Sequence, residues 1–200
     1  MIAGGLPSSE LIVIDRWLSE QSCREILRDL EFVWWWPSET ASLNAHGQLE
    51  QRQSFCRTSR GSNETWLSGP VRRHIRRLEQ RLANEIGINP AFLDPWQVVR
   101  YRQGELFEEH HDAGLFAESV HGERMATLIL YLDDQPGASG ATVFPQLKRK
   151  VTSRAGRILL WRNLRDDGSI DPLMRHSGTP ARRTKTLLTT WLRERSVRTS

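Results

Sequence analysis

The chain has 200 residues, of which 38% are hydrophobic and 26% are charged, and its formal net charge is +4 at pH 7. This length and apolar content are enough for a sizeable core, so we expect one domain over residues 1–200. Because no run of 18 or more apolar residues occurs, the composition excludes a membrane-spanning helix.

The N-terminal segment predicts a strand followed by a helix. Residues 10–16 alternate like a strand, and Ser19 then offers an N-cap to a helix that runs to about Leu30. The beginning of the chain lacks the basic and long apolar parts of a signal peptide, and Cys23 and Cys56 have no metal-type spacing. We therefore expect a cytoplasmic protein with two ordinary thiols.

The polar stretch from Trp36 to Asn63 is predicted to be mainly loop, with short strands at most. Pro37, Gly47 and Gly61 interrupt it, and it is too long for a simple connection. Loops of this length in compact domains are often lids or binding loops. We therefore expect this stretch to take part in covering a functional site.

A basic amphipathic helix is predicted over residues 71–87. Its apolar residues recur at helical spacing: Val71, Ile75, Leu78, Leu82 and Ile86. Its other faces carry Arg72, Arg73, Arg76, Arg77 and Arg81. A solvated helix surface explains these charges best, and a contact with nucleic acid is the alternative.

The second half of the chain is rich in predicted strands, near residues 96–103, 106–112, 124–133, 141–145, 157–162 and 184–194. Gly, Pro and Asp turns separate them. Helices first and strands later indicate an α+β domain. We expect its core, about residues 96–195, to be a jelly roll of two packed sheets with N-terminal supporting helices.

Two histidines and one aspartate in this half predict a metal site. If residues 106–112 form a strand, His110 and Asp112 point to one face while His111 points to the other. The H-x-D pair alone is a weak signal, but His176 in MRHSGTP can complete it. Two imidazoles and one carboxylate on one face of an iron ion are the ligand set of non-haem Fe(II) oxygenases. We therefore predict His110, Asp112 and His176 as the metal ligands.

The motifs around these ligands extend the pattern. VVRYRQGELFEEHHD places Tyr101 ahead of the ligands, and RMATLILYLDD, SGATVFP and RAGRILLW lie between Asp112 and His176. Lys185 and Trp191 follow, while LIVIDRWLSEQSCREIL and FCRTSRGSNETWL come earlier. In this order and spacing, over roughly residues 10–195, the chain resembles the prolyl 4-hydroxylase-like family of 2-oxoglutarate-dependent Fe(II) oxygenases. The resemblance implies a double-stranded β-helix with the iron at one open end.

The resemblance also implies an enzyme with Fe(II), 2-oxoglutarate and O2, and with ascorbate as a further candidate cofactor. Lys185 would pair with the distal carboxylate of 2-oxoglutarate, and Tyr101 would add a hydrogen bond to the same molecule. Tyr131 and Thr142 are weaker candidates for supporting this site. Because related halogenases lack the carboxylate ligand, the presence of Asp112 favours hydroxylation.

Three residues depart from the family pattern. Ser139 stands at the first Gly of the usual G-G-x-T, and Ser153 stands at the Pro of V-x-P-x-x-G. Lys185 lies one residue closer to the distal histidine than is most common, which leaves Arg183 open as the cation. Trp191 lies at the family's distance from Lys185 and favours the lysine.

The sequence therefore favours hydroxylation of a C–H bond in a prolyl or other amino-acid side chain, free or in a peptide, with release of succinate and CO2. One alternative is an enzyme that oxidises or demethylates nucleic acid, with the arginine helix on the phosphates. Another is a noncatalytic or different-metal binding protein, which would leave Lys185 and Tyr101 without a role. The sequence assigns no oligomeric state, and substrate contacts lie in variable loops.

Overall fold

The computed structural model describes residues 10–46, 48–53, 55–63 and 67–198, and the expectation about a signal peptide concerns residues outside this part. It contains the helices α1 (Glu20–Asp29) and α2 (Gly69–Arg81). Short helical turns cover Leu30–Phe32, Leu82–Ile86, Pro90–Phe92 and Pro172–Met174. The strands are β1 (Ile12–Ile14), β2 (Trp36–Pro37), β3 (Glu39–Leu43), β4 (Leu49–Gln53), β5 (Arg60–Asn63), β6 (Gln97–Tyr101), β7 (Phe107–His110), β8 (Arg124–Tyr131), β9 (Thr142–Phe144), β10 (Arg149–Val151), β11 (Ile158–Arg162), β12 (His176–Gly178) and β13 (Lys185–Arg193).

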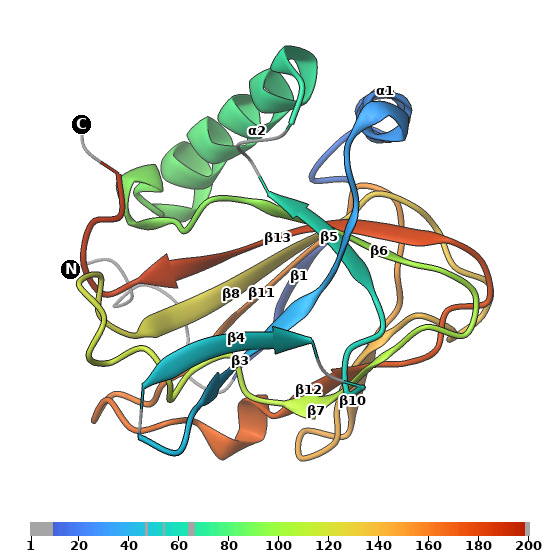
Figure 1. Ribbon diagram of the computed structural model, residues 1–200. Helices are drawn as coiled ribbons and strands as arrows, with labels where there is room; N and C mark the ends of the chain where they lie inside the picture. The colour runs from blue at the N-terminus through green and yellow to red at the C-terminus, as the bar shows by residue number, and fades with distance from the viewer. Residues whose placement is uncertain (1–9, 47, 54, 64–66, 199–200) are drawn as a thin grey trace.

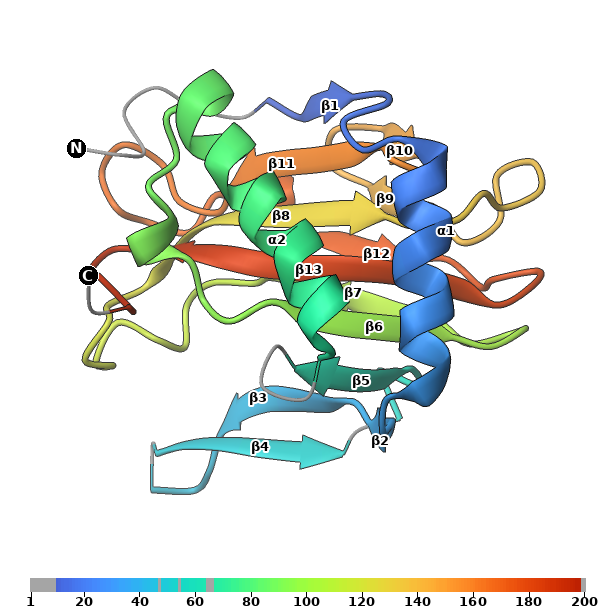
Figure 2. The same cartoon turned by 90° about the horizontal axis from the view of Figure 1, so that it is seen from above.

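Two antiparallel sheets form the body of the protein. The large sheet has the strand order β1-β11-β8-β13-β6-β5-β2, and the small sheet has the order β10-β9-β12-β7. The helices α1 and α2 cover one face of the large sheet, and the small sheet lies on the side away from them (Figures 1 and 2). The strands β3 and β4 form a separate hairpin. The architecture is α+β, as the order of predicted helices and strands indicates.

Both helices begin at a capping serine. Ser19 caps α1 and Ser68 caps α2, and each hydroxyl accepts a hydrogen bond from a backbone N–H of the first turn. Helix α2 begins at Gly69, two residues earlier than the apolar spacing predicts, and passes at Leu82 into a π turn. No helix in the described part of the chain is long and apolar enough to cross a membrane.

One core lies between the helices and the large sheet. Val71, Ile75 and Leu78 of α2 are buried in one apolar cluster with Ile26 of α1 and Leu128 of β8. On the other faces of α2, four of the five predicted surface arginines are exposed: Arg72, Arg73, Arg76 and Arg77. The burial pattern agrees with a solvated amphipathic helix.

A second core lies between the two sheets. Along β8, Leu128 and Leu130 belong to the core under the helices, whereas Ile129 and Tyr131 belong to the core between the sheets. Phe144 of the small sheet packs in that second core. Because β8 is buried on both faces, its sequence is a continuous apolar run rather than an alternating one.

The prediction that residues 36–63 are mainly loop is wrong for much of this stretch. It contains β2, β3, β4 and β5, and β3 pairs with β4 from Glu39 opposite Gln53 to Leu43 opposite Leu49. Most side chains of β4 are exposed, so its sequence lacks the apolar alternation that marks a half-buried strand. The strands β10 and β12 were not predicted, because their sequences RKV and HSG lack the run of β-branched and aromatic residues that marks a strand.

Gly156 joins the large sheet to the segment before α1. Its N–H donates to Tyr131 O over 2.9 Å, and its carbonyl accepts from Leu18 N over 3.1 Å. Its φ is 76°, in the left-handed region, and a Cβ at this position would clash with the carbonyl oxygen of Leu18. Gly168 has a similar φ of 82°, but a Cβ there would meet nothing within 4 Å.

We expect Gly156→Ala to lower the free energy of unfolding by about 3 kcal/mol, because strained backbone and a steric clash combine. Gly168→Ala should cost about 1 kcal/mol, because only the backbone conformation is unfavourable there. Urea denaturation of both variants measures the difference. Equal losses in the two variants would contradict the packing of Gly156 against Leu18.

Candidate metal centre

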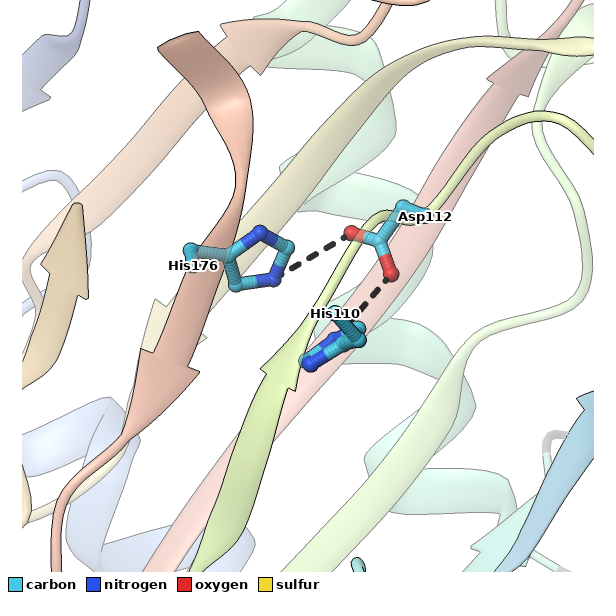
Figure 3. A group of neighbouring side chains, drawn as sticks. All are labelled: His110, Asp112 and His176. Atoms are coloured by element: carbon cyan, nitrogen blue, oxygen red, sulfur yellow. Dashed lines mark ion pairs between the residues drawn. The ribbon is translucent and has the colours of Figure 1, made fainter. Parts of the chain in front are cut away.

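The two predicted histidine ligands lie on adjacent strands of the small sheet. His110 ends β7 and His176 begins β12, and the two residues are paired across this antiparallel ladder. Their ring centroids are 4.3 Å apart. Asp112 lies beyond the end of β7, so the prediction of a strand over residues 106–112 is wrong at its C-terminal end. The turn after His110 nevertheless brings the Asp112 carboxylate between the two imidazoles (Figure 3).

The carboxylate faces one nitrogen of each ring. His110 Nε2 lies 3.6 Å from Asp112 Oδ1, and His176 Nε2 lies 3.6 Å from Asp112 Oδ2. Each Nδ1 is instead close to a backbone carbonyl, at 2.8 Å from Glu108 O and 2.9 Å from Met174 O. When Nδ1–H donates to these carbonyls, the Nε2 lone pair of the neutral ring is available to a metal.

Charges at the site suit metal binding near neutral pH. Burial lowers the pKa of His176 to about 4, so this ring is neutral at pH 7. Burial raises the pKa of Asp112, but the neighbouring His176 and His110 outweigh burial and hold that pKa well below its usual range. The site therefore offers the neutral imidazole of His176 and the ionised carboxylate of Asp112 beside the imidazole of His110.

Two hydrogen-bonded polar side chains and two aromatic rings hold these ligands in place. Thr127 Oγ1 of β8 donates to Asp112 Oδ2 over 2.7 Å, and Asn163 Nδ2 donates to Thr127 Oγ1 over 3.0 Å. Phe107 stacks on the His110 ring at 3.7 Å between centroids, and Trp161 meets the His176 ring edge-on at 4.8 Å. Sequence reasoning missed Thr127 and Asn163, since neither belongs to a ligand motif.

The arrangement fits a single ion. Ligand atoms of His110, Asp112 and His176 all lie within 4.8 Å of one another. Three ligands at roughly 2.1 Å from one ion lie about 3 Å apart when they share one face of an octahedron, so small side-chain shifts would suffice. Two imidazoles and one carboxylate in this arrangement suit Fe(II) and leave the opposite face open. His111 is not part of this group of ligand atoms.

A cavity beside the metal ligands contains a buried cation. Tyr101, Thr142 and Lys185 line it together with His110, Asp112 and His176. Lys185 is 3% exposed, and its Nζ lies 4.9 Å from the centre of the Tyr101 ring. Burial lowers the pKa of Lys185 to about 8, so most of the ammonium groups are still charged at pH 7.

The other predicted site residues are placed as follows. The Tyr131 hydroxyl lies 2.7 Å from Thr142 Oγ1, so Tyr131 supports the cavity wall from behind Thr142. Arg183 is exposed, and its Nε and Nη2 donate to the carbonyl of Asp134 at 3.0 and 2.7 Å. Its guanidinium is thus bound at the surface, and the geometry favours Lys185 as the cation of the cavity.

A wider outer cavity opens beside His110. Thr40 and Gln51 of the β3-β4 hairpin line one part of it, and Leu115 and Phe116 after the ligand Asp112 line another. Arg57 borders both the inner and the outer cavity. The segment that the sequence suggested as a cover, residues 36–63, therefore borders this opening together with the segment after Asp112.

Comparisons with known proteins agree with this geometry. The family model of the 2OG-Fe(II) oxygenase superfamily matches residues 96–193. Prolyl 4-hydroxylase subunit alpha-1 of Gallus gallus is 33% identical over 143 residues, which cover 68% of this chain and 28% of that protein. The chain thus spans about a quarter of the length of this relative.

Solved structures show the same fold at low sequence identity. The viral collagen prolyl hydroxylase of Paramecium Bursaria Chlorella virus-1, solved with 2OG, has a TM-score of 0.66 and 21% identity, covering 92% of this chain and 95% of its own. A prolyl hydroxylase of Trichoplax adhaerens, in complex with a hypoxia inducible factor peptide fragment, also has a TM-score of 0.66, with 15% identity and coverages of 97% and 88%.

We expect Thr127→Val to weaken metal binding about 10-fold, because valine keeps the shape of the side chain but removes the hydroxyl that orients Asp112. Titration of the metal-free protein with Mn(II) measures the affinity. Thr186→Val is a suitable control, because Thr186 is equally buried in the next strand and does not contact the ligands. An affinity of Thr127→Val equal to that of the unchanged protein would show that Asp112 is oriented without this hydrogen bond.

Proposed function

The chain belongs to the 2OG-Fe(II) oxygenase superfamily, and from this premise we propose that it hydroxylates an unactivated C–H bond of a prolyl or other amino-acid side chain. The substrate is a free amino acid or a peptide. The cofactors of the reaction are Fe(II) and 2-oxoglutarate. The observation that carries the proposal is the convergence of His110, Asp112 and His176 in a cavity that also contains the buried ammonium of Lys185.

Each residue has a distinct part in the proposal. Fe(II) would be held on one side by His110, Asp112 and His176. The Asp112 carboxylate would occupy the ligand position that a halide takes in the related halogenases. The buried charge of Lys185 binds the distal carboxylate of 2-oxoglutarate, and a charge-assisted hydrogen bond of this kind contributes about 1.5–3 kcal/mol. The Tyr101 hydroxyl adds a neutral hydrogen-bonding group in the same cavity. Burial raises the pKa of Tyr101, so its phenol stays protonated.

Bound Fe(II), with 2-oxoglutarate and O2, supplies the oxidation that turns C–H into C–OH. One oxygen atom of O2 enters the substrate, and the other enters succinate as 2-oxoglutarate loses CO2. The apolar rings of Phe107, Phe144 and Trp161 around the histidines exclude water from the reacting atoms.

The substrate class rests on the relatives and on the outer cavity. The Gallus gallus relative and both structural relatives carry the name of prolyl hydroxylases, and one was solved with a peptide. The outer cavity is open between the β3-β4 hairpin and Phe116, and it presents both charged and apolar groups beside His110. Such an opening suits a side chain that enters from a peptide.

The geometry does not favour the nucleic-acid alternative. The exposed arginines of α2 belong to the helix layer, on the opposite face of the large sheet from β7 and β12 (Figure 1). A nucleic acid bound along α2 would lie far from the metal ligands. We also infer that the two sheets form a double-stranded β-helix, or jelly roll, which α1 and α2 support from outside.

The proposal is tested by incubating the protein with Fe(II), 2-oxoglutarate and a panel of proline-containing peptides and free amino acids. We expect one product heavier by a single oxygen atom, with one succinate per product, measured by mass spectrometry. His110→Ala should abolish this product, because two ligands neither hold nor orient the metal. His111→Ala should keep at least about half of the activity, since His111 is not a ligand. Full activity of His110→Ala with an inactive His111→Ala would exchange the two assignments.

We expect Lys185→Ala to raise the KM for 2-oxoglutarate by about 10-fold or more, because the distal carboxylate loses its partner in a buried cavity and each decade corresponds to about 1.4 kcal/mol. Arg183→Ala should leave this KM within about twofold. Initial rates at varied 2-oxoglutarate give both values. A large rise in Arg183→Ala alone would assign the carboxylate to Arg183.

A further inference from the structure

Asp133 lies next to Lys185 where β8 leaves the large sheet. The register pairs Leu188 with Leu130 and Leu187 with Tyr131, so one further step of two residues brings Asp133 opposite Lys185. Here the carboxylate replaces a backbone acceptor, because Thr186 N donates to Asp133 Oδ2 over 2.6 Å. The side chain of Asp133 therefore closes the ladder at the residue that follows the lysine.

Gln135 holds the chain on the other side of Lys185. Its Nε2 donates to Thr184 O over 3.1 Å and lies 3.4 Å from Asp133 Oδ1. Its Oε1 accepts from Arg183 N over 3.4 Å. Gln135 is 7% exposed, so these bonds are shielded from water. The peptide groups before and after Lys185 are both fixed by side chains that follow β8.

Asp133 also acts on the charge of Lys185. Burial lowers the pKa of Lys185, and the field of Asp133 raises it. Burial raises the pKa of Asp133 itself to about 6, while its bonds from Thr186 N–H and Gln135 and the charge of Lys185 lower it. Asp133 is therefore mainly ionised at pH 7, where it can stabilise the ammonium.

The other titratable groups around Asp133 are few. Arg183 lowers the pKa of Asp133, and Asp133 in turn acts on Arg100 of β6 and on the thiol of Cys23 in α1. Burial raises the pKa of Cys23 to about 11, so this thiol stays neutral near pH 7. Of Lys185 and Cys23, which both interact with Asp133, Lys185 with its pKa of about 8 is the one that changes its charge between about pH 6.5 and 9.

We propose that Asp133 is a positioning residue for 2-oxoglutarate: it fixes the backbone that carries Lys185 and sets a carboxylate opposite this lysine in the ladder. This inference rests on the proposed role of Lys185 in binding the distal carboxylate. Two opposite effects follow from the Asp133 charge. It holds the proton on Lys185, which favours binding at high pH, and it repels the incoming carboxylate, which opposes binding at all pH values where Asp133 is ionised.

The test is the pH dependence of 2-oxoglutarate binding, measured by calorimetry on the protein saturated with Mn(II). The affinity of the unchanged protein should fall as pH rises through about 8. In Asp133→Asn the amide oxygen still accepts from Thr186 N–H, but Lys185 loses its proton at lower pH. We expect this variant to bind 2-oxoglutarate about fivefold more weakly than the unchanged protein at about pH 8.5, and within about twofold at about pH 6.5, since one pKa unit changes the charged fraction by up to about tenfold.

Asp134→Asn is the matched control. Asp134 is adjacent and exposed, and its Oδ1 accepts from Ala155 N over 2.9 Å, away from Lys185. Its pH profile should coincide with that of the unchanged protein. If Asp133→Asn does not fold, Asp133→Ser gives the same comparison, because its hydroxyl replaces the acceptor without a charge.

The outcomes separate the inference from the proposed function. An equal loss of affinity at every pH, or a profile identical to that of the unchanged protein, overturns the role of Asp133 in the charge of Lys185. The pH-dependent effect of Asp133→Asn should vanish when the same substitution is made in a chain that already carries Lys185→Ala, and its persistence there also overturns the inference. Unchanged binding in Lys185→Ala alone overturns instead the proposed role of Lys185.

Discussion

The pairing of β7 with β12 is the contact on which the site depends. It places His176 directly opposite His110, so the strand pairing alone brings together two ligands from segments far apart in the chain. The turn after His110 then needs to deliver only one carboxylate. Thr127 of β8 holds that carboxylate and is itself bonded to Asn163 after β11, so both sheets contribute to the position of Asp112.

The large sheet acts as a common wall for two different environments. Its face under α1 and α2 is packed with aliphatic side chains, whereas its face toward the small sheet carries Tyr101, Tyr131 and Lys185. Because successive side chains of a strand point to opposite faces of the sheet, neighbouring residues lie in these two different environments. A polar site can therefore lie against a sheet whose other side is held rigidly by the helices.

The sequence was sufficient for the parts of the molecule that depend on local pattern. The caps and apolar stripes of the helices, the long buried strands, the metal-type residues and the family could all be predicted, and the comparisons confirm the family. The β3-β4 hairpin was missed because its polar, exposed strands show no apolar alternation. Thr127 was missed because a threonine in an apolar strand looks the same whether or not its hydroxyl reaches a ligand. The sequence favoured Lys185 over Arg183 through the spacing to Trp191, and the burial of Lys185 in the cavity adds a geometric reason that the sequence could not supply. The cytoplasmic location and the single-domain organisation remain predictions.

The β3-β4 hairpin belongs to neither the large nor the small sheet, and most of the side chains of β4 are exposed. Arg57 anchors it through a hydrogen bond from Nη1 to Glu39 O over 3.1 Å, which uses the backbone of the hairpin and not its side chains. Substitutions along the hairpin therefore avoid the penalties of core packing while they alter one wall of the opening beside His110. In evolutionary terms, selectivity for new substrates can drift in this segment while the metal site and the folding stability stay under separate selection.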